Sequence, residues 1–156
     1  MNYWLLKTEP SVFGIDDLEA CGKRGSAWDG VRNYQARNML RDQMRKGDLA
    51  FLYHSSCEEP GITGIMEIAS PGRPDPTAFD PKDHHYDPDS RPDDPRWYLV
   101  DVRLKRRVGR LIPLEELRRH KPLSGMQLLK RGNRLSVMPV SKAHWDYILK
   151  LEHKNS

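Results

Sequence analysis

The stretch Tyr3-Trp4-Leu5-Leu6-Lys7-Thr8 decides the expected fold class. Its side chains alternate between two faces, and both faces are apolar at the start, which predicts a central strand buried on two sides. Pro10 ends the strand, because proline cannot donate to a strand ladder. Near that end Lys7 and Glu9 fall on one face. Two interpretations are open: a salt bridge at the strand end, or a donor and an acceptor at the floor or rim of a pocket.

The rest of the chain predicts both strands and helices. Strands are expected at residues 49–53, 62–69, 97–108 and 135–140, and helices within 11–21, over 34–44 and 114–120, in a turn at 126–130 and after Ser141. Asn33 is the expected N-cap of the helix over 34–44, whose inner face would include Tyr34. This order does not suit a doubly wound sheet. We therefore expect an α+β fold in which a mixed β-sheet curls into a partly open barrel flanked by helices.

Residues 71–95 differ in composition, with seven prolines and seven aspartates. No regular element is expected at this density of proline. The segment is too long for a plain connector, so we expect either contacts that order it or a function of its own. Because the strand that follows is needed to complete the sheet, the segment is not a domain boundary. The whole chain, 1–156, is predicted to be a single domain.

Composition limits the classes of protein further. The net charge of +4 makes the chain mildly basic, which alone is weak support for a polyanionic partner. The two cysteines, Cys21 and Cys57, lie far apart, which argues against a disulfide framework or a zinc ribbon. The sequence shows neither a secretory signal nor an apolar run near the ~20 residues of a membrane span. We expect a cytoplasmic monomer with no membrane partner.

The stretch Trp28-Asp29-Gly30-Val31-Arg32-Asn33-Tyr34-Gln35-Ala36-Arg37 combines groups that recognise a flat, polar ring. Tryptophan and tyrosine stack, asparagine and glutamine offer a paired donor and acceptor, and arginine binds phosphate. None of these groups is an obvious nucleophile. The pattern favours a binding site over a reaction centre.

Catalytic and metal sites have less support. No G-x-S-x-G, H-E-x-x-H, P-loop or G-x-G-x-x-G motif occurs, and a dyad of His54 with Ser55 is geometrically poor because strand neighbours point to opposite faces. Metal-ligand types gather in the acidic segment: Asp83, His84, His85, Asp87 and Asp89. A proline-rich loop does not obviously fix a coordination geometry, so a solvated acidic loop is the favoured interpretation. We predict no catalytic residue, no metal and no cofactor.

Basic residues flank the Trp28–Arg37 stretch and recur later in the chain. For each cluster alone, a phosphate-tracking face and an ordinary solvated face are equally open. Their coincidence with stacking and base-edge groups favours nucleic acid, because phosphate contacts position and base contacts specify. The residues expected to contact the nucleic-acid backbone are Arg32, Arg37, Arg41, Arg106 and Arg107.

Five motifs in order make the chain similar to the EVE domain, in the branch typified by thymocyte nuclear protein 1. They are Tyr3-Trp4-Leu5-Leu6-Lys7-Thr8-Glu9-Pro10, Trp28 to Asn38, Gly47-Asp48 with Phe51-Leu52-Tyr53-His54-Ser55, Pro95-Arg96-Trp97 with Val100-Asp101-Val102, and Arg134-Leu135-Ser136-Val137 with Pro139-Val140. The resemblance implies a PUA-like fold related to the YTH domains that read a methylated base. It also implies a pocket for a modified base, with modified cytosine in DNA favoured and RNA as the alternative.

The resemblance further implies which residues bind the base. Carried over position by position, they are Lys7, Glu9, Trp28, Val31, Asn33, Tyr34, Gln35, Ala36, Tyr53, Ser55, Arg134, Leu135 and Ser136. In the resulting hypothesis the extruded base stacks on Trp28, its polar edge meets Asn33 or the pair Lys7 and Glu9, and no reaction follows. Two rivals remain: an RNA-binding or RNA-processing enzyme of the same fold, and a protein-interaction module that uses the acidic loop. Which base modification is bound, and which protein partners exist, is open.

Overall fold

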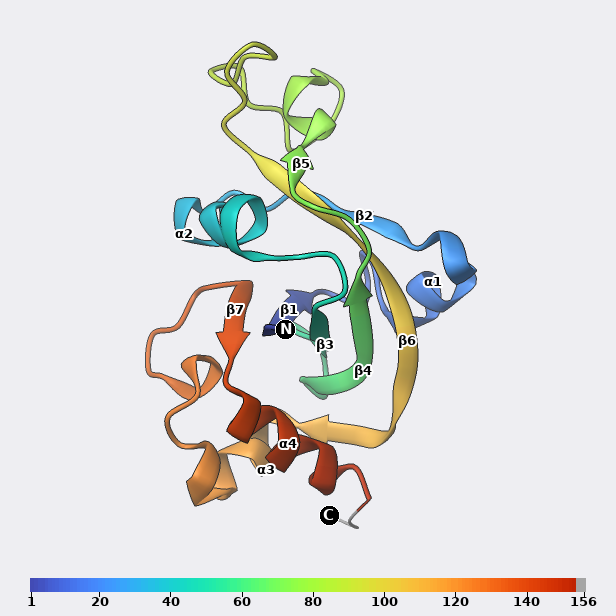
Figure 1. Cartoon of the computed structure of the whole chain (residues 1–156), viewed down its shortest axis with the longest axis vertical. Helices are drawn as coiled ribbons and strands as arrows, with labels where there is room; N and C mark the ends of the chain where they lie inside the picture. The colour runs from blue at the N-terminus through green and yellow to red at the C-terminus, as the bar shows by residue number, and fades with distance from the viewer. Residues whose placement is uncertain (154–156) are drawn as a thin grey trace.

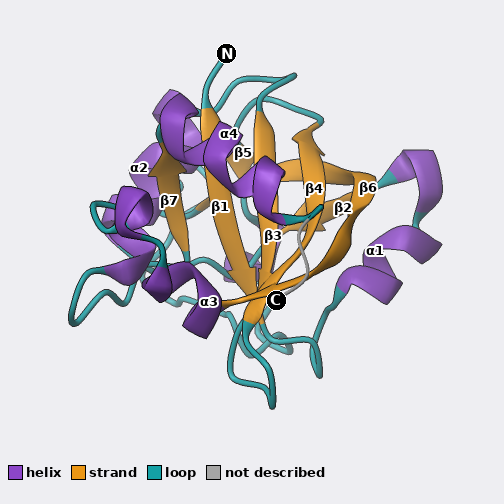
Figure 2. Ribbon diagram, turned by 90° about the horizontal axis from the view of Figure 1, so that it is seen from below, coloured by secondary structure: helices purple, strands orange, loops and turns teal. Residues whose placement is uncertain are grey.

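In the computed structural model, which describes residues 1–153, seven strands form one curled sheet with the order β2-β6-β4-β3-β1-β7, and β5 pairs with β6 (Figure 1). The strands are β1 (Tyr3–Thr8), β2 (Ser26–Trp28), β3 (Leu49–His54), β4 (Gly61–Ile68), β5 (Arg73–Pro74), β6 (Tyr98–Pro113) and β7 (Val137–Val140). β1 runs parallel to β3, whereas the other pairs are antiparallel. The predicted curled, mixed sheet with flanking helices is confirmed (Figure 2).

The first strand is central, as its two apolar faces predict. β1 lies between β3 and β7, and Trp4, Leu5 and Leu6 are almost fully buried. The Trp4 indole donates a hydrogen bond of 3.0 Å to the buried carboxylate of Asp48. The parallel register sets Lys7 beside Tyr53 at the end of the strand. Lys7 is therefore carried near the end of a strand that has neighbours on both sides.

Four α-helices flank the sheet within the described chain: α1 (Ile15–Ala20), α2 (Tyr34–Asn38), α3 (Leu114–Arg119) and α4 (Lys142–Leu151). Short 3₁₀ turns lie at Gly22–Arg24, Pro76–Phe79, Lys121–Leu123 and Gln127–Leu129. α4 lies across one face of the sheet (Figure 2), where Trp145 stacks on Phe51 with ring centroids 3.9 Å apart. Among residues 1–153, no helix is both long and apolar enough to cross a membrane.

The helix predicted over residues 34–44 divides into two parts. α2 ends at Asn38, and a π-helix follows at Met39–Gln43. Asn33 is the N-cap, as predicted, and its Oδ1 accepts a hydrogen bond of 2.9 Å from the amide of Ala36. Tyr34 does not face the core; it is 52% exposed and stacks on Trp97 at 4.9 Å. That expectation was wrong because Trp97 offers the tyrosine an aromatic partner outside the core.

Outside residues 71–95, three strands differ from the sequence prediction by more than one residue. β2 was missed, because three residues are too few to show alternation. β6 extends to Pro113, five residues past the predicted end, because Arg106, Arg107 and Gly109 interrupt its apolar pattern. β7 begins at Val137, two residues later than expected.

The acidic segment 71–95 forms one end of the molecule, beyond β5 and at the opposite end from α4 (Figure 1). The expectation of no regular element was wrong in two short places. β5 pairs with β6, and Pro76–Phe79 forms a 3₁₀ turn whose N-cap, Asp75, accepts from the amide of Thr77. A proline at the first position of such a turn costs no hydrogen bond, because that amide has no partner in the turn.

Candidate nucleic-acid interface

A cavity of about 690 Å³ opens where the end of β1, the end of β2 and the acidic segment meet. Its size falls within the range of small-molecule pockets, about 300–1,000 Å³. The walls are formed by residues 7–9, 12–13, 26–32, 83–85 and Ser136. Five of the thirteen residues predicted to bind the base line it: Lys7, Glu9, Trp28, Val31 and Ser136.

Lys7 carries an ammonium group without a carboxylate partner. Its Nζ lies 5.7 Å from the centre of the Tyr53 ring, and within residues 1–153 no carboxylate forms an ion pair with it. Burial lowers the pKa of Lys7, as expected for a half-buried cation that lacks an opposite charge. The salt bridge with Glu9, one of the two interpretations of this strand end, does not form. Lys7 is therefore a donor available to a ligand in the cavity.

Trp28 supplies the aromatic wall. It is the last residue of β2, where it pairs with Val100 of β6, and it is 7% exposed. Phe13 meets its ring edge-on, with centroids 6.4 Å apart and planes at 89°. This contact fixes the indole from one side, so its orientation is set before any ligand arrives.

The turn after Trp28 adds a carboxylate and a close backbone approach. Gly30 has a φ of +79°, and a Cβ at this position would lie 2.5 Å from Nε2 of His85. Its amide donates to Asp75 at 2.8 Å. Burial raises the pKa of Asp29, and repulsion from Asp75 raises it further. Asp29 thus accepts a proton more readily than an ordinary aspartate does.

Arg32 fastens the acidic segment to this turn. Its guanidinium donates to Asp75 at 3.0 Å, to Thr77 Oγ1 at 3.1 Å and to the carbonyl oxygen of His85 at 2.8 Å. Asp75 is fully buried, and burial alone would raise its pKa; hydrogen bonds from Thr77, Gly30 and Arg32 outweigh that effect and hold the pKa below its usual value. Arg32 is engaged within the protein, so its placement does not suit the expected phosphate contact.

Several predicted base-binding residues lie outside the cavity wall. Ala36 is fully buried and Tyr53 is 2% exposed. Burial raises the pKa of Tyr53 to about 12. Ser55 donates its amide to Thr8 at 2.8 Å. The remaining residues of this kind are Asn33, Tyr34 and Gln35, which are exposed around the start of α2, and Arg134 and Leu135, which precede Ser136.

The other arginines expected to contact the nucleic-acid backbone are also engaged with the protein. Arg106 binds Glu152 at 2.6 Å, and Arg107 binds Glu19 at 3.0 Å, along a separate groove. Arg41 pairs with its neighbour Asp42, and Arg37 donates to the carbonyl oxygen of Arg96 at 2.9 Å. The structure does not bring Arg106 and Arg107 to the cavity, because β6 carries them away from β2.

His54 has a structural partner. Its Nε2 accepts a hydrogen bond of 3.1 Å from the amide of Ile15, which begins α1. Burial lowers the pKa of His54, consistent with a neutral ring that accepts from the backbone. This contact uses the ring nitrogen that a catalytic base would need.

The cavity also contains residues that sequence reasoning did not assign to it. Phe13, Asp29 and Asp83-His84-His85 line its wall. Asp29 directly follows Trp28 in the sequence, and this position could have assigned it to the site. Residues 83–85 lie about fifty positions further along the chain, and no local pattern connects them to Trp28.

Residues 2–151, nearly the whole length of the chain, match the EVE domain family. The chain belongs to the EVE domain family.

Known proteins resemble this EVE domain in both sequence and structure. Thymocyte nuclear protein 1 of Mus musculus is 48% identical over 168 residues, which cover 97% of this chain and 74% of the mouse protein. A crystal structure of human THYN1 in complex with 5-methylcytosine-containing DNA superposes with a TM-score of 0.93 at 45% identity and full coverage of both chains. A protein from Pseudomonas syringae superposes with a TM-score of 0.92 at 45% identity, covering 96% of this chain and 99% of that one.

Proposed function

We propose that this EVE domain binds DNA that carries a modified cytosine and holds that base, turned out of the duplex, in the cavity beside Trp28. The observation that carries the proposal is the Lys7 ammonium, which has no carboxylate partner in the described part of the chain and lines a cavity with an aromatic wall. The DNA complex of human THYN1, whose chain in that structure is 45% identical to this one and fully covered by it, supports the choice of ligand.

The chemistry of cytosine suits the groups around the cavity. Its edge offers an amino donor and two acceptors, the ring nitrogen and the carbonyl oxygen. Lys7 can donate to an acceptor, while the carboxylates of Glu9 and Asp29 can accept from the amino group. Stacking on Trp28 contributes about 1–3 kcal/mol, which offsets part of the few kcal/mol that unstacking the base costs. Each group thus has a role in holding a flat base.

The proposal includes no chemical step. His54, the histidine weighed as a catalytic residue, already accepts a hydrogen bond from the backbone amide of Ile15. Incubation with labelled DNA and RNA, followed by mass spectrometry, should return both unchanged. Turnover that disappears in Lys7→Gln would instead favour the rival enzyme.

The decisive test measures binding to duplexes that differ at one cytosine. Fluorescence anisotropy should give tighter binding to a duplex with one 5-methylcytosine than to the unmodified duplex. Lys7→Gln should weaken binding to the methylated duplex, whereas Lys150→Gln, an exposed lysine on α4, should leave it unchanged. Equal affinity for both duplexes, together with no effect of Lys7→Gln, would refute the proposal. Tighter binding to matched RNA would redirect it to RNA.

Three further expectations belong to this proposal. The chain acts as one domain over residues 1–156 and as a monomer, which light scattering during gel filtration checks. The cytoplasmic location expected from the sequence stays a prediction, and the names of the relatives point to the nucleus for those proteins. A fluorescent fusion in the source cell decides the location. The acidic segment serves as a wall of the cavity, so a partner that binds it would compete with DNA.

A further inference from the structure

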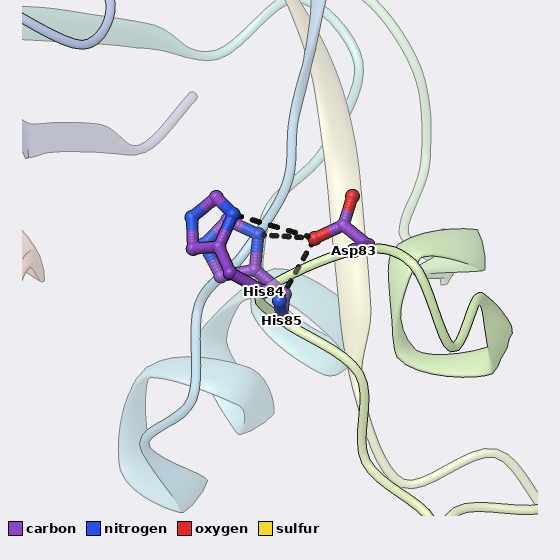
Figure 3. Close-up of side chains that lie close together, drawn as sticks. All are labelled: Asp83, His84 and His85. Atoms are coloured by element: carbon purple, nitrogen blue, oxygen red, sulfur yellow. Dashed lines mark hydrogen bonds and ion pairs between the residues drawn. The ribbon is translucent and has the colours of Figure 1, made fainter.

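Asp83, His84 and His85 bring three metal-ligand side chains together at the wall of the cavity. Their ligand atoms all lie within 4.8 Å of one another. Figure 3 shows both imidazole rings with a nitrogen directed at the same carboxylate oxygen of Asp83. The two rings lie 3.8 Å apart between centroids. This arrangement brings two nitrogen donors close to one oxygen donor.

The spacings suit a small divalent ion. Zinc binds nitrogen and oxygen at about 2.0–2.2 Å, so neighbouring ligand atoms of a tetrahedral site stand about 3.3–3.6 Å apart. Oδ1 of Asp83 lies 3.1 Å from Nδ1 of His85 and 3.8 Å from Nδ1 of His84. Both distances come within a few tenths of an ångström of the required separation. The two nitrogen atoms lie within 4.8 Å of one another, and rotation of the exposed His84 side chain can set their separation.

The loop that carries these residues is held in place by hydrogen bonds. The sequence favoured a solvated loop, because a proline-rich loop does not obviously fix a coordination geometry. The carbonyl oxygen of His85 accepts from Arg32 at 2.8 Å, and its amide donates to Asp83 at 2.8 Å. The His85 ring packs against Gly30, where any side chain would collide with it. The Asp83 amide donates to the carbonyl oxygen of Asp80 at 2.9 Å. Two of the three ligands are therefore fixed before an ion binds.

We propose that Asp83, His84 and His85 form a binding site for a divalent transition-metal ion at the wall of the cavity. Imidazole nitrogen with carboxylate oxygen is a donor set typical of Zn²⁺ and its neighbours in the first transition row. Three protein ligands leave at least one coordination position open. Because all three residues line the cavity, an oxygen or nitrogen atom of a molecule in the cavity can occupy that position.

Among the three ligands His84 has the least buried side chain, so it must become ordered when an ion binds. Its side chain is 80% exposed, whereas those of Asp83 and His85 are each 27% exposed. Replacement of His84 therefore removes a ligand and, apart from the ring contact with His85, disturbs little packing. The same substitution at His153, an exposed histidine after α4, removes an imidazole far from the cavity and serves as the matched control.

The test titrates the tag-free full chain with Zn²⁺ against a chromophoric chelator. The wild-type chain and His153→Asn should bind one equivalent with the same affinity, and His84→Asn and Asp83→Asn should bind about tenfold more weakly or worse. Circular dichroism checks that each variant is folded. Equal Zn²⁺ affinity in wild type and His84→Asn would overturn the proposal. The result does not depend on DNA, so the metal site and the proposed function stand or fall separately.

Discussion

Replacement of Arg32 by methionine should separate a fastening role from a phosphate contact. The guanidinium donates five hydrogen bonds within the protein and faces a carboxylate with no solvent exposure. Methionine keeps much of the side-chain volume but removes the charge and every donor. Asp75 would then remain buried with three donors, the amides of Gly30 and Thr77 and the hydroxyl of Thr77.

The size of the effect follows from these contacts. Breaking a buried ion pair by removal of one partner costs about 3–5 kcal/mol. The lower end applies here, because the Arg32 side chain is 23% exposed and Asp75 keeps its other donors. About 3 kcal/mol is a large fraction of the stability of a typical domain, about 5–15 kcal/mol. For a chain of this length the melting temperature should fall by about 6–12 °C.

Thermal and urea unfolding of the wild type, Arg32→Met and Arg91→Met measure this cost. Arg91 pairs with Asp93 at the surface, where both side chains are more than two-thirds exposed, so its replacement should change the stability by less than about 0.5 kcal/mol. If Arg32→Met is as stable as Arg91→Met, the fastening role is wrong. The expected phosphate contact of Arg32 would then regain its place.

Three further outcomes are expected. Trp28→Phe should keep the fold and weaken binding of the methylated duplex severalfold in anisotropy, because the smaller ring offers less stacking area; unchanged affinity would argue against Trp28 as the wall. Gly30→Ala should lower the urea midpoint and, by displacing His85, weaken Zn²⁺ binding, because its φ is +79° and its Cβ would meet the ring; a variant as stable as wild type would show that the loop can move. Because the folded-state pKa of Asp75 is lowered, the unfolded chain binds its proton first, so stability should fall as the pH drops below about 4. Asp75→Asn should flatten that pH dependence in urea titrations, and an unchanged slope would mean that other carboxylates cause it.

The fold was largely predictable because the sequence pattern of its central strand is clear. Two apolar faces in residues 3–8 require neighbours on both sides, and β1 has them. The helix N-caps at Asn33 and Ser141 were also predictable, because the cap is a local interaction. Each side chain accepts a hydrogen bond from the backbone amide three residues further along the chain. β2 was not readable, because its partners lie in β6, more than seventy residues away.

The candidate site was predictable in part. Lys7 and Trp28 could be singled out from local chemistry, and both line the cavity. Ala36 and Tyr53 came with the family resemblance, yet both are buried and neither lines the cavity. The engagement of Arg32 could not be foreseen, because a guanidinium suited to phosphate is equally suited to a buried aspartate. The sequence holds no local sign of which partner it meets.

The position of the acidic segment makes the charge distribution of the molecule uneven from one end to the other. Seven aspartates against three cations leave residues 71–95 at −4, within a chain whose total is +4. Since that segment forms one end of the molecule (Figure 1), positive charge prevails over the remainder. The field of a polyanion exerts a torque on such a body and turns its acidic end away during approach. Because added salt screens this field, it should reduce the orienting effect.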